Sequence, residues 1–404
     1  MVDFLKTAYV DLYNRIRKLK SKIDARSTEF DIDVSALFVQ DTLDLLETLE
    51  LETFRIIESG FLDFELLMPN NLYLYNKYIL RYEFIDSNLA EIILQYDAAE
   101  RFFNRLINKI YKESNILAIA KPIVTLTSNS KKYYWVEQIA GVEILALPRG
   151  EEECLLHLPN LYHEIAHLFC FKYQDGNMLS KFIAELKRYF HAEWVRIKNE
   201  KVKVETRHAE LEEVRTLWET KWVWELACDL IATFLVGPAY VWTALILNTK
   251  AQGEDLLYRW KPNHPPDATR IRIILLMLDK LDLQFEREQI NQVWTKFLAL
   301  TKNPRPTHYK SYFPDQILEL LVEEVFSFCK DARLVPISTL LKEPTTTFAV
   351  QLNETWSYAR AHQSLFDIYE RDFLLKLKRE LGLIIDYENS TEEEEEDFGD
   401  LTQL

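Results

Sequence analysis

Glycine is the residue whose scarcity most constrains this chain. Only eight glycines occur in 404 residues, about 2% of the chain against an average usage of about 7%. Glycine provides the positive backbone φ angles that tight β-turns and phosphate-binding loops require, so a chain with so few is poor in both. Hydrophobic residues make up 48% of the sequence, enough for a buried core. The sequence therefore predicts a mainly helical globular protein.

The pattern of apolar residues changes along the chain. In residues 1–118, leucines such as Leu43 and Leu46 recur near the spacing of a helix. Three short runs between residues 123 and 147, IVTLTS, YYWVEQ and VEILAL, are rich in β-branched and aromatic residues and predict a small sheet. Helical patterns return near Pro159. The predicted fold class is therefore mainly α with a small β-sheet (α+β).

Charge and cysteine usage limit the partners and the compartment. The formal net charge of −16 has the wrong sign for a surface that binds nucleic-acid phosphates, so we expect no nucleic-acid partner. The N-terminal residues mix charged and apolar side chains and lack the apolar region of a signal peptide, so we expect a cytoplasmic location. Four cysteines match no zinc knuckle or CxxC motif and are predicted to be buried free thiols: Cys154, Cys170, Cys228 and Cys329.

One uncharged stretch, residues 230–248, has nearly the length of a membrane-spanning helix. Gly237 and Pro238 interrupt it, and Glu225 and Asp229 lie just before it. Proline disrupts a helix interior because it lacks the amide hydrogen and clashes with the preceding turn. We therefore predict two buried core helices and no membrane partner, with a membrane anchor as the alternative.

The segment LPNLYHEIAHLFC contains the motif HExxH as His163, Glu164 and His167. Residues four apart lie about 40° apart around a helix, so both imidazoles can reach one metal ion from the same side. Glu164 lies about 100° from His163, where a carboxylate can accept a proton from metal-bound water. The flanking residues are apolar, so this helix is predicted to be buried. Its polar triplet predicts a zinc site with a general base.

A second apolar segment, KWVWELACDLIATFLV, carries two acids four residues apart, Glu225 and Asp229. Buried carboxylates are costly unless a positive group meets them, and a zinc ion held by two histidines is such a group. Glu225 then completes a His, His, Glu ligand set and leaves the fourth position to water, as catalytic zinc requires. Asp229 is predicted to accept the outer ring N–H of a ligating histidine, first of all His163. The alternative is that lysine or arginine side chains neutralise both acids.

A third motif, HPPDATR, pairs a histidine with an arginine. Two prolines follow His264, and Arg270 stands six residues after it, at the head of the apolar run RIRIILLMLDKL. Prolines restrict the backbone, so the segment could place an imidazole and a guanidinium over the metal. Taken alone, the pattern is also that of a loop followed by a helix start, and both interpretations stay open.

Together, HExxH, ExxxD on a later helix and HPPxxxR resemble the motif set of the gluzincin metallopeptidases related to HtpX and the CAAX prenyl endoproteases. The resemblance covers residues 133–280 and implies a zincin-like catalytic core with one Zn²⁺ per chain. It implies His163, His167 and Glu225 as zinc ligands, Glu164 as the general base, and His264 with Arg270 as supporting groups near the oxyanion or the ligand carboxylates.

The chain departs from those membrane relatives in two respects. It has no clear transmembrane helix, and a charged segment separates His167 from Glu225, so prenyl substrates are not expected. The expected regions are an N-terminal helical region (1–118), a zincin-like catalytic domain (119–302) with a charged helical arm at about 176–220, a C-terminal helical region (303–386) and a disordered acidic tail (387–404).

We therefore expect a zinc metalloendopeptidase of gluzincin type that acts on a protein or peptide substrate. The strand predicted at residues 141–147 is either an edge strand that pairs with the substrate backbone or an ordinary sheet strand. A regulatory protein partner could gate the site through the charged arm or the N-terminal helices. Two alternatives stay open: a catalytically silent interaction protein stabilised by its metal, and a membrane-associated processing protease.

Overall fold

The fold is described from a computed structural model of the chain. It confirms the fold class predicted from the sequence, because helices dominate and one small sheet is present. The described residues are 2–30, 34–117, 119–127, 135–139, 142–173, 178–199, 204–250, 257–301, 305–344 and 346–384.

The sheet has three strands in the order β1-β3-β2: β1 (Ile123–Thr127), β2 (Trp135–Ile139) and β3 (Val142–Pro148). β3 pairs in parallel with β1 and antiparallel with β2. The interpretation of residues 141–147 as an edge strand is therefore wrong, because β3 has a partner on each side. β2 is the edge strand that contacts the HExxH helix.

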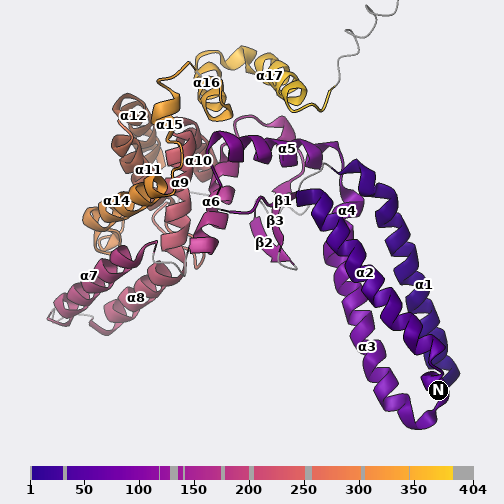
Figure 1. Ribbon diagram of the computed structural model, residues 1–404. Helices are drawn as coiled ribbons and strands as arrows, with labels where there is room; N and C mark the ends of the chain where they lie inside the picture. The colour runs from indigo at the N-terminus through magenta and orange to yellow at the C-terminus, as the bar shows by residue number, and fades with distance from the viewer. Residues whose placement is uncertain are drawn as a thin grey trace, which may run out of the picture.

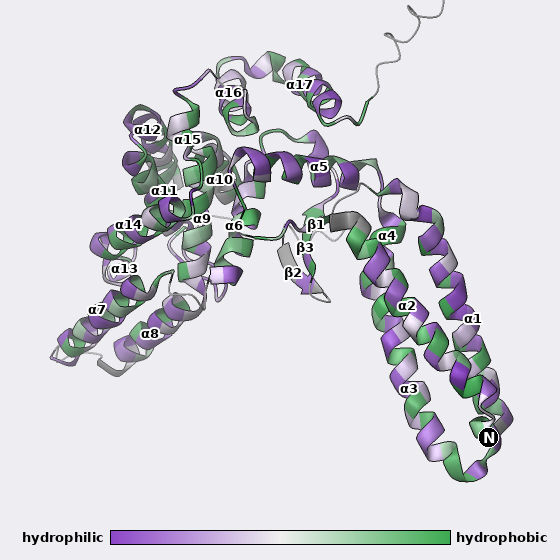
Figure 2. Ribbon diagram, in the orientation of Figure 1, coloured by the Kyte–Doolittle hydropathy of each residue, from purple (hydrophilic) through white to green (hydrophobic). Residues whose placement is uncertain are grey.

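The first four helices form a long arm that extends away from the rest of the molecule (Figure 1): α1 (Val2–Arg26), α2 (Val34–Glu58), α3 (Met68–Phe84) and α4 (Glu91–Gln95). Apolar residues of α1 alternate three and four apart, the spacing of helices that pack along one another. Their side chains are 0–5% exposed and belong to a hydrophobic core that is separate from that of the other helices: Leu5, Tyr9, Leu12, Ile16, Leu19 and Ile23. In Figure 2 hydrophobic and hydrophilic residues alternate along this arm.

The larger core surrounds one buried helix. α9 (Val223–Val236) contacts α6 (Asn160–Tyr173), α10 (Pro238–Lys250), α11 (Asp267–Lys280) and α14 (Asp315–Asp331). Every residue of α9 from 226 to 236 is buried. A carboxylate on such a helix, as Asp229 is, has almost no access to bulk water, so its neighbours must satisfy it.

The uncharged stretch at 230–248 breaks where the sequence predicts. α9 ends before Gly237, which has a φ of 64°, a left-handed conformation that glycine adopts without strain. A Cβ atom there would lie 2.8 Å from Cγ2 of Ile337, so no larger residue fits without a shift. Pro238 then begins α10, a position where its missing N–H costs nothing. No helix among the described residues is long and apolar enough to cross a membrane.

The charged segment forms a helical hairpin of α7 (Ser180–Lys198) and α8 (Val204–Leu217), which projects on the same side as the N-terminal arm, with the sheet between them (Figure 1). The predicted acidic tail lies outside the described residues. The remaining helices are α5 (Ala98–Glu113), α12 (Gln284–Thr301), α13 (Tyr309–Tyr312), α15 (Ile337–Leu340), α16 (Phe348–Ala361) and α17 (Phe366–Glu380).

Candidate metal centre

α6 carries the HExxH motif on a helix that is buried along most of its length. Apolar neighbours such as Leu161 and Ile165 are fully buried, which fixes the helix against the core and turns its polar residues toward α9. His163 and His167 follow one another on one face, with ring centroids 4.9 Å apart and planes at 85°. The helical period thus brings the two imidazoles together, as predicted.

Glu225 of α9 completes the group. Its carboxylate oxygens lie 3.7 Å from Nε2 of His163 and 3.7 Å from Nε2 of His167. One ligand atom from each of the three residues can be chosen so that all lie within 4.8 Å of one another. Ligand atoms of a tetrahedral zinc ion with bonds of about 2.0–2.1 Å are separated by about 3.4 Å, so a small inward shift suffices.

The donor chemistry of this group also fits a metal ion. Oε2 of Glu225 is buried and has no hydrogen-bond partner among the described residues. A buried carboxylate oxygen without a hydrogen bond is costly, and a cation would remove that cost. The His163, His167 and Glu225 group can therefore hold a metal ion.

Asp229 connects His163 to a buried arginine. Its Oδ1 atom lies 3.0 Å from Nδ1 of His163, the ring nitrogen that faces away from Glu225. Arg270 of α11 donates two hydrogen bonds to the same carboxylate, at 2.8 and 2.7 Å. The hydroxyl of Tyr240 on α10 donates to Asp229 as well and lies 3.1 Å from Nδ1 of His163. Three helices thus orient one candidate ligand.

His167 has a different outer partner. The thiol of Cys228 lies 3.3 Å from its Nδ1 atom, and no carboxylate occupies that place among the described residues. Cys170 lies 3.6 Å further on, sulfur to sulfur, and both thiols are buried. A thiol sulfur is a weak acceptor compared with a carboxylate oxygen. The two histidines are therefore held by contacts of unequal strength.

The two histidines also differ in protonation when no metal is present. Burial disfavours charge on His163, but the hydrogen bonds and charges of Asp229 and Glu225 outweigh it and raise the pKa to about 10. Burial, helped by the charge of His163, lowers the pKa of His167 to about 4. The ring of His167 is thus already neutral, whereas His163 must release a proton to become a ligand.

Glu164 stands beside this group and is 6% exposed. Burial raises the pKa of its carboxyl to about 7, against the opposing charge of His163. Its carboxylate makes no hydrogen bond to any described residue. An acid with a pKa near neutrality is suited to accept and return a proton.

The HPPxxxR residues occupy two different places. Nδ1 of His264 lies 3.3 Å from Oε2 of Glu225, and its side chain is 51% exposed, so it borders the open side of the group. Arg270 instead lies behind Asp229, and its pKa is raised, although burial alone would lower it, because that carboxylate faces it. Arg270 therefore pairs with Asp229 behind His163, while His264 lies on the exposed side of the group.

Two contacting residues were missed by sequence reasoning. Tyr240 carries a hydroxyl group within the uncharged stretch of the sequence, and a buried tyrosine hydroxyl generally needs a hydrogen-bond partner. Cys228 follows Glu225 by three residues and so shares its helix face, a signal that was present but not used. His157, six residues before His163, pairs with Glu151 at 3.0 Å.

Comparisons with protein-family models, with curated proteins and with solved structures give no match for this chain. The interpretation of the site therefore depends on the chemistry of its own residues.

Proposed function

We propose that the protein is a zinc-dependent metalloendopeptidase that hydrolyses peptide bonds. The observation that carries the proposal is the convergence of His163, His167 and Glu225, with a buried carboxylate oxygen that makes no hydrogen bond, beside the buried acid Glu164. Two histidines and one glutamate are a donor set typical of catalytic zinc, which keeps its fourth position for water or substrate. We expect one zinc per chain.

Bound zinc lowers the pKa of water and polarises a carbonyl oxygen. Glu164 accepts a proton from the attacking water while the oxygen of that water bonds to the carbonyl carbon of the substrate. It then returns that proton to the amide nitrogen as the C–N bond breaks. His264, on the open side, is placed to donate a hydrogen bond to the carbonyl oxygen. Asp229, Tyr240 and Arg270 hold His163 in one orientation.

The surroundings favour an extended polypeptide as the substrate. β2 is the sheet edge beside α6, and an exposed edge can pair with a peptide backbone. A cavity of about 560 Å³ adjoins this edge and is lined by residues that include Gln138, Glu143, Leu168 and Phe171. The ring of Phe171, which lines this cavity, lies 6.2 Å from that of His167, one of the candidate ligands. A substrate side chain next to the cleaved bond would enter the cavity.

Glu164→Gln tests the proposal most directly. The amide keeps the shape of the side chain but cannot accept the water proton, so cleavage should become undetectable while zinc content stays at one per chain. Wild type and variant are expressed in parallel and compared by metal analysis and by a proteome-wide search for new N-termini. Glu153→Gln, at an exposed residue outside the site, is the matched control and should behave as wild type.

Identical N-terminal profiles with zinc present in both proteins would overturn the peptidase and favour the metal-stabilised interaction protein. A chain that takes up no zinc, even when zinc is added, would remove the whole proposal. A regulatory partner and a cytoplasmic location stay predictions from the sequence.

A further inference from the structure

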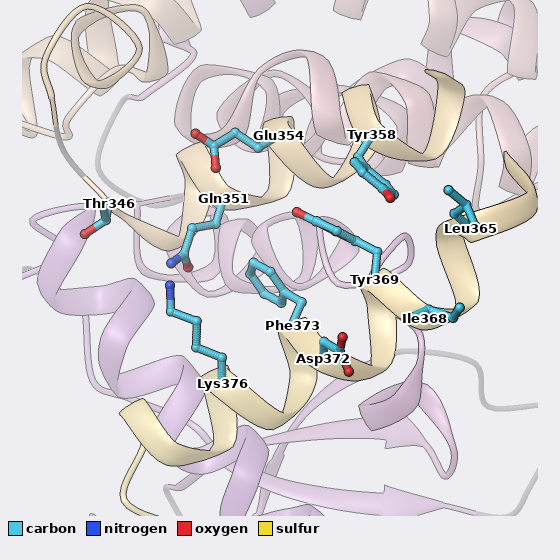
Figure 3. Close-up of a pocket in the computed structure, with 10 residues that line it drawn as sticks. All are labelled: Thr346, Gln351, Glu354, Tyr358, Leu365, Ile368, Tyr369, Asp372, Phe373 and Lys376. Carbon is cyan, nitrogen blue, oxygen red and sulfur yellow. The ribbon is translucent and has the colours of Figure 1, made fainter. Parts of the chain in front are cut away.

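A second cavity lies in the C-terminal helices. It has a volume of about 580 Å³, within the range of about 300–1,000 Å³ that small-molecule sites occupy. Figure 3 shows that α16 and α17 turn facing side chains into it. On α16 the lining residues Gln351, Glu354 and Tyr358 are three and four apart, so they share one helix face.

The cavity contains a buried acceptor without a donor. Gln351 is 7% exposed, and its Oε1 atom is buried with no hydrogen-bond partner among the described residues. A buried amide oxygen left unpaired costs about 1–3 kcal/mol. Figure 3 shows this side chain directed into the space between the two helices. A ligand with an N–H donor would satisfy it.

Aromatic rings form one wall. Tyr358 and Tyr369 stack with centroids 4.2 Å apart, and Phe373 continues the row at 6.1 Å from Tyr369. Aromatic faces attract cations, and arginine guanidinium groups in particular stack on them. This wall and the orphan acceptor therefore favour the same kind of ligand.

The charged residues at the cavity are two carboxylates and one amine. Glu354 has no ion-pair partner among the described residues, and Asp372 has only an exposed neighbour, Arg371, at 3.8 Å. Lys376 is 70% exposed and lies 3.9 Å from Glu380. Acidic side chains thus outnumber the lysine at this cavity. The lysine lies at the rim, where it would compete with an incoming cation for the carboxylates.

We propose that this cavity binds a guanidinium group, either as the side chain of an arginine in a polypeptide or as a free alkylguanidine. The planar guanidinium carries five N–H donors, so it can donate to Gln351 Oε1 and to Glu354 while its face lies on the aromatic row. An ammonium group offers fewer donors and no plane to stack. The site is independent of the metal centre and of any peptidase activity.

Calorimetry on the full-length protein tests the proposal with N-acetyl-arginine amide as the probe. The matched neutral compound is N-acetyl-citrulline amide, which has nearly the same shape and no charge. We expect arginine amide to bind at one site per chain, and citrulline amide at least about 10-fold more weakly because charge-assisted hydrogen bonds are lost. Agmatine, which lacks the amide backbone, separates the two sources: equal affinity indicates a free guanidine, and weaker affinity an arginine in a chain.

Three variants locate the binding. Glu354→Gln, at an exposed position, should weaken the binding of arginine amide by about 10-fold, whereas the matched control Glu319→Gln on α14 should not. Gln351→Leu should weaken it similarly. Lys376→Met should strengthen it, since the competing charge is removed. No binding to wild type or to Lys376→Met, equal affinity for citrulline amide, or weaker binding after Lys376→Met would each overturn the proposal.

Discussion

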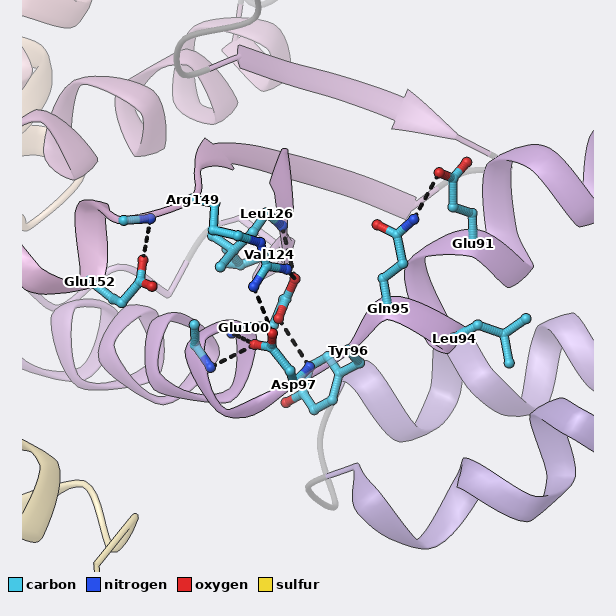
Figure 4. Close-up of polar contacts among 12 residues, drawn as sticks. Glu91, Leu94, Gln95, Tyr96, Asp97, Glu100, Val124, Leu126, Arg149 and Glu152 are labelled. Atoms are coloured by element: carbon cyan, nitrogen blue, oxygen red, sulfur yellow. Dashed lines mark hydrogen bonds and ion pairs between the residues drawn. The ribbon is translucent and has the colours of Figure 1, made fainter. Parts of the chain in front are cut away.

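Two pairs of carboxylates in this protein are built from similar parts and differ in what they leave unpaired. Asp97 and Glu100 stand at the start of α5 and face Arg149, as Figure 4 shows. Glu225 and Asp229 stand on α9 and face histidines and Arg270. In each place two nearby acids meet an arginine from a distant part of the chain.

In the first pair every carboxylate oxygen has a donor. Asp97 accepts from the amide nitrogens of Ala99 and Glu100, and from Arg149 at 2.7 Å. Glu100 accepts from the amide of Asp97 at 3.0 Å and from that of Leu126 at 3.3 Å. The group is a helix cap that also holds β1. Nothing is left for a ligand.

In the second pair one oxygen is left over. Asp229 is satisfied by Arg270, Tyr240 and His163, but Oε2 of Glu225 has no hydrogen bond among the described residues. It lies 3.3 Å from Nδ1 of His264 and 3.7 Å from Nε2 of His163. Burial alone therefore does not distinguish the two pairs, whereas a carboxylate oxygen without a hydrogen bond does.

The largest expected effect comes from replacing the carboxylate that carries this oxygen. Glu225→Gln should reduce zinc affinity by more than about 100-fold, because it removes a ligand and not only an outer partner, whose loss costs about 10–100-fold. Competition with a chromogenic chelator measures this. Glu100→Gln, the equivalent change in the first pair, should leave zinc affinity unchanged. Equal affinities for wild type and Glu225→Gln would show that the leftover oxygen is not a ligand.

Asp229→Ala should affect zinc and the fold together. Zinc affinity should fall by about 10–100-fold as His163 loses its partner. Arg270 would also be left buried without its carboxylate, and breaking such a pair typically costs about 3–5 kcal/mol. Chelator competition and urea unfolding measure the two effects.

The double variant Asp229→Ala with Arg270→Met separates them. It removes the unpaired charge, so much of the stability should return while zinc affinity stays low. If zinc affinity also returned to the wild-type value, Asp229 would have a structural role only.

Helical periodicity explains how much of the metal centre could be predicted. His163 with His167, and Glu225 with Asp229, are spaced by four, so each pair shares a helix face whatever the rest of the chain does. Tyr240 reaches the site only because Gly237 turns the chain between α9 and α10. That contact depends on tertiary packing, which local spacing does not contain.

The sheet shows the same limit. The run VEILAL has the composition of a strand, and β3 forms there. Its place in the centre of the sheet depends on pairing with Ile123–Thr127, a partner that is about twenty residues earlier. Strand order is a long-range property, so the composition of one strand does not distinguish an edge from a centre.

The cap should respond to pH in a way that the metal centre does not influence. Burial, and then the neighbouring side-chain carboxylate of Asp97, raise the pKa of Glu100 to about 7 from a usual value of 4.5. The folded state then binds this proton more tightly than the unfolded state, so stability is greatest below about pH 4.5 and is lost as pH rises toward 7. Glu100→Gln removes the titration.

Urea unfolding at pH 5 and pH 8 measures this effect. Groups shared by both proteins cancel, so the stability of wild type relative to Glu100→Gln should fall between the two pH values. A constant or rising difference would mean that Glu100 is ionised in the folded protein even at pH 5.

The smallest expected effect concerns the unequal support of the two histidines. When Nε2 of His167 binds zinc, the Nδ1 atom of the same ring carries the proton and donates a hydrogen bond to the sulfur of Cys228. Because sulfur is a weak acceptor, Cys228→Ala should lower zinc affinity by less than about 10-fold, below the range expected for Asp229→Ala. Cys170→Ala is the matched control. It removes a buried thiol that contacts the thiol of Cys228 and not the ring of His167. This variant should lose a similar amount of stability and leave zinc affinity unchanged.

The ¹⁵N chemical shift of the His167 ring gives a second measurement, and this shift should change in Cys228→Ala alone. Equal losses of zinc affinity in both variants would mean that the thiols act through packing, and that His167 needs no outer hydrogen bond.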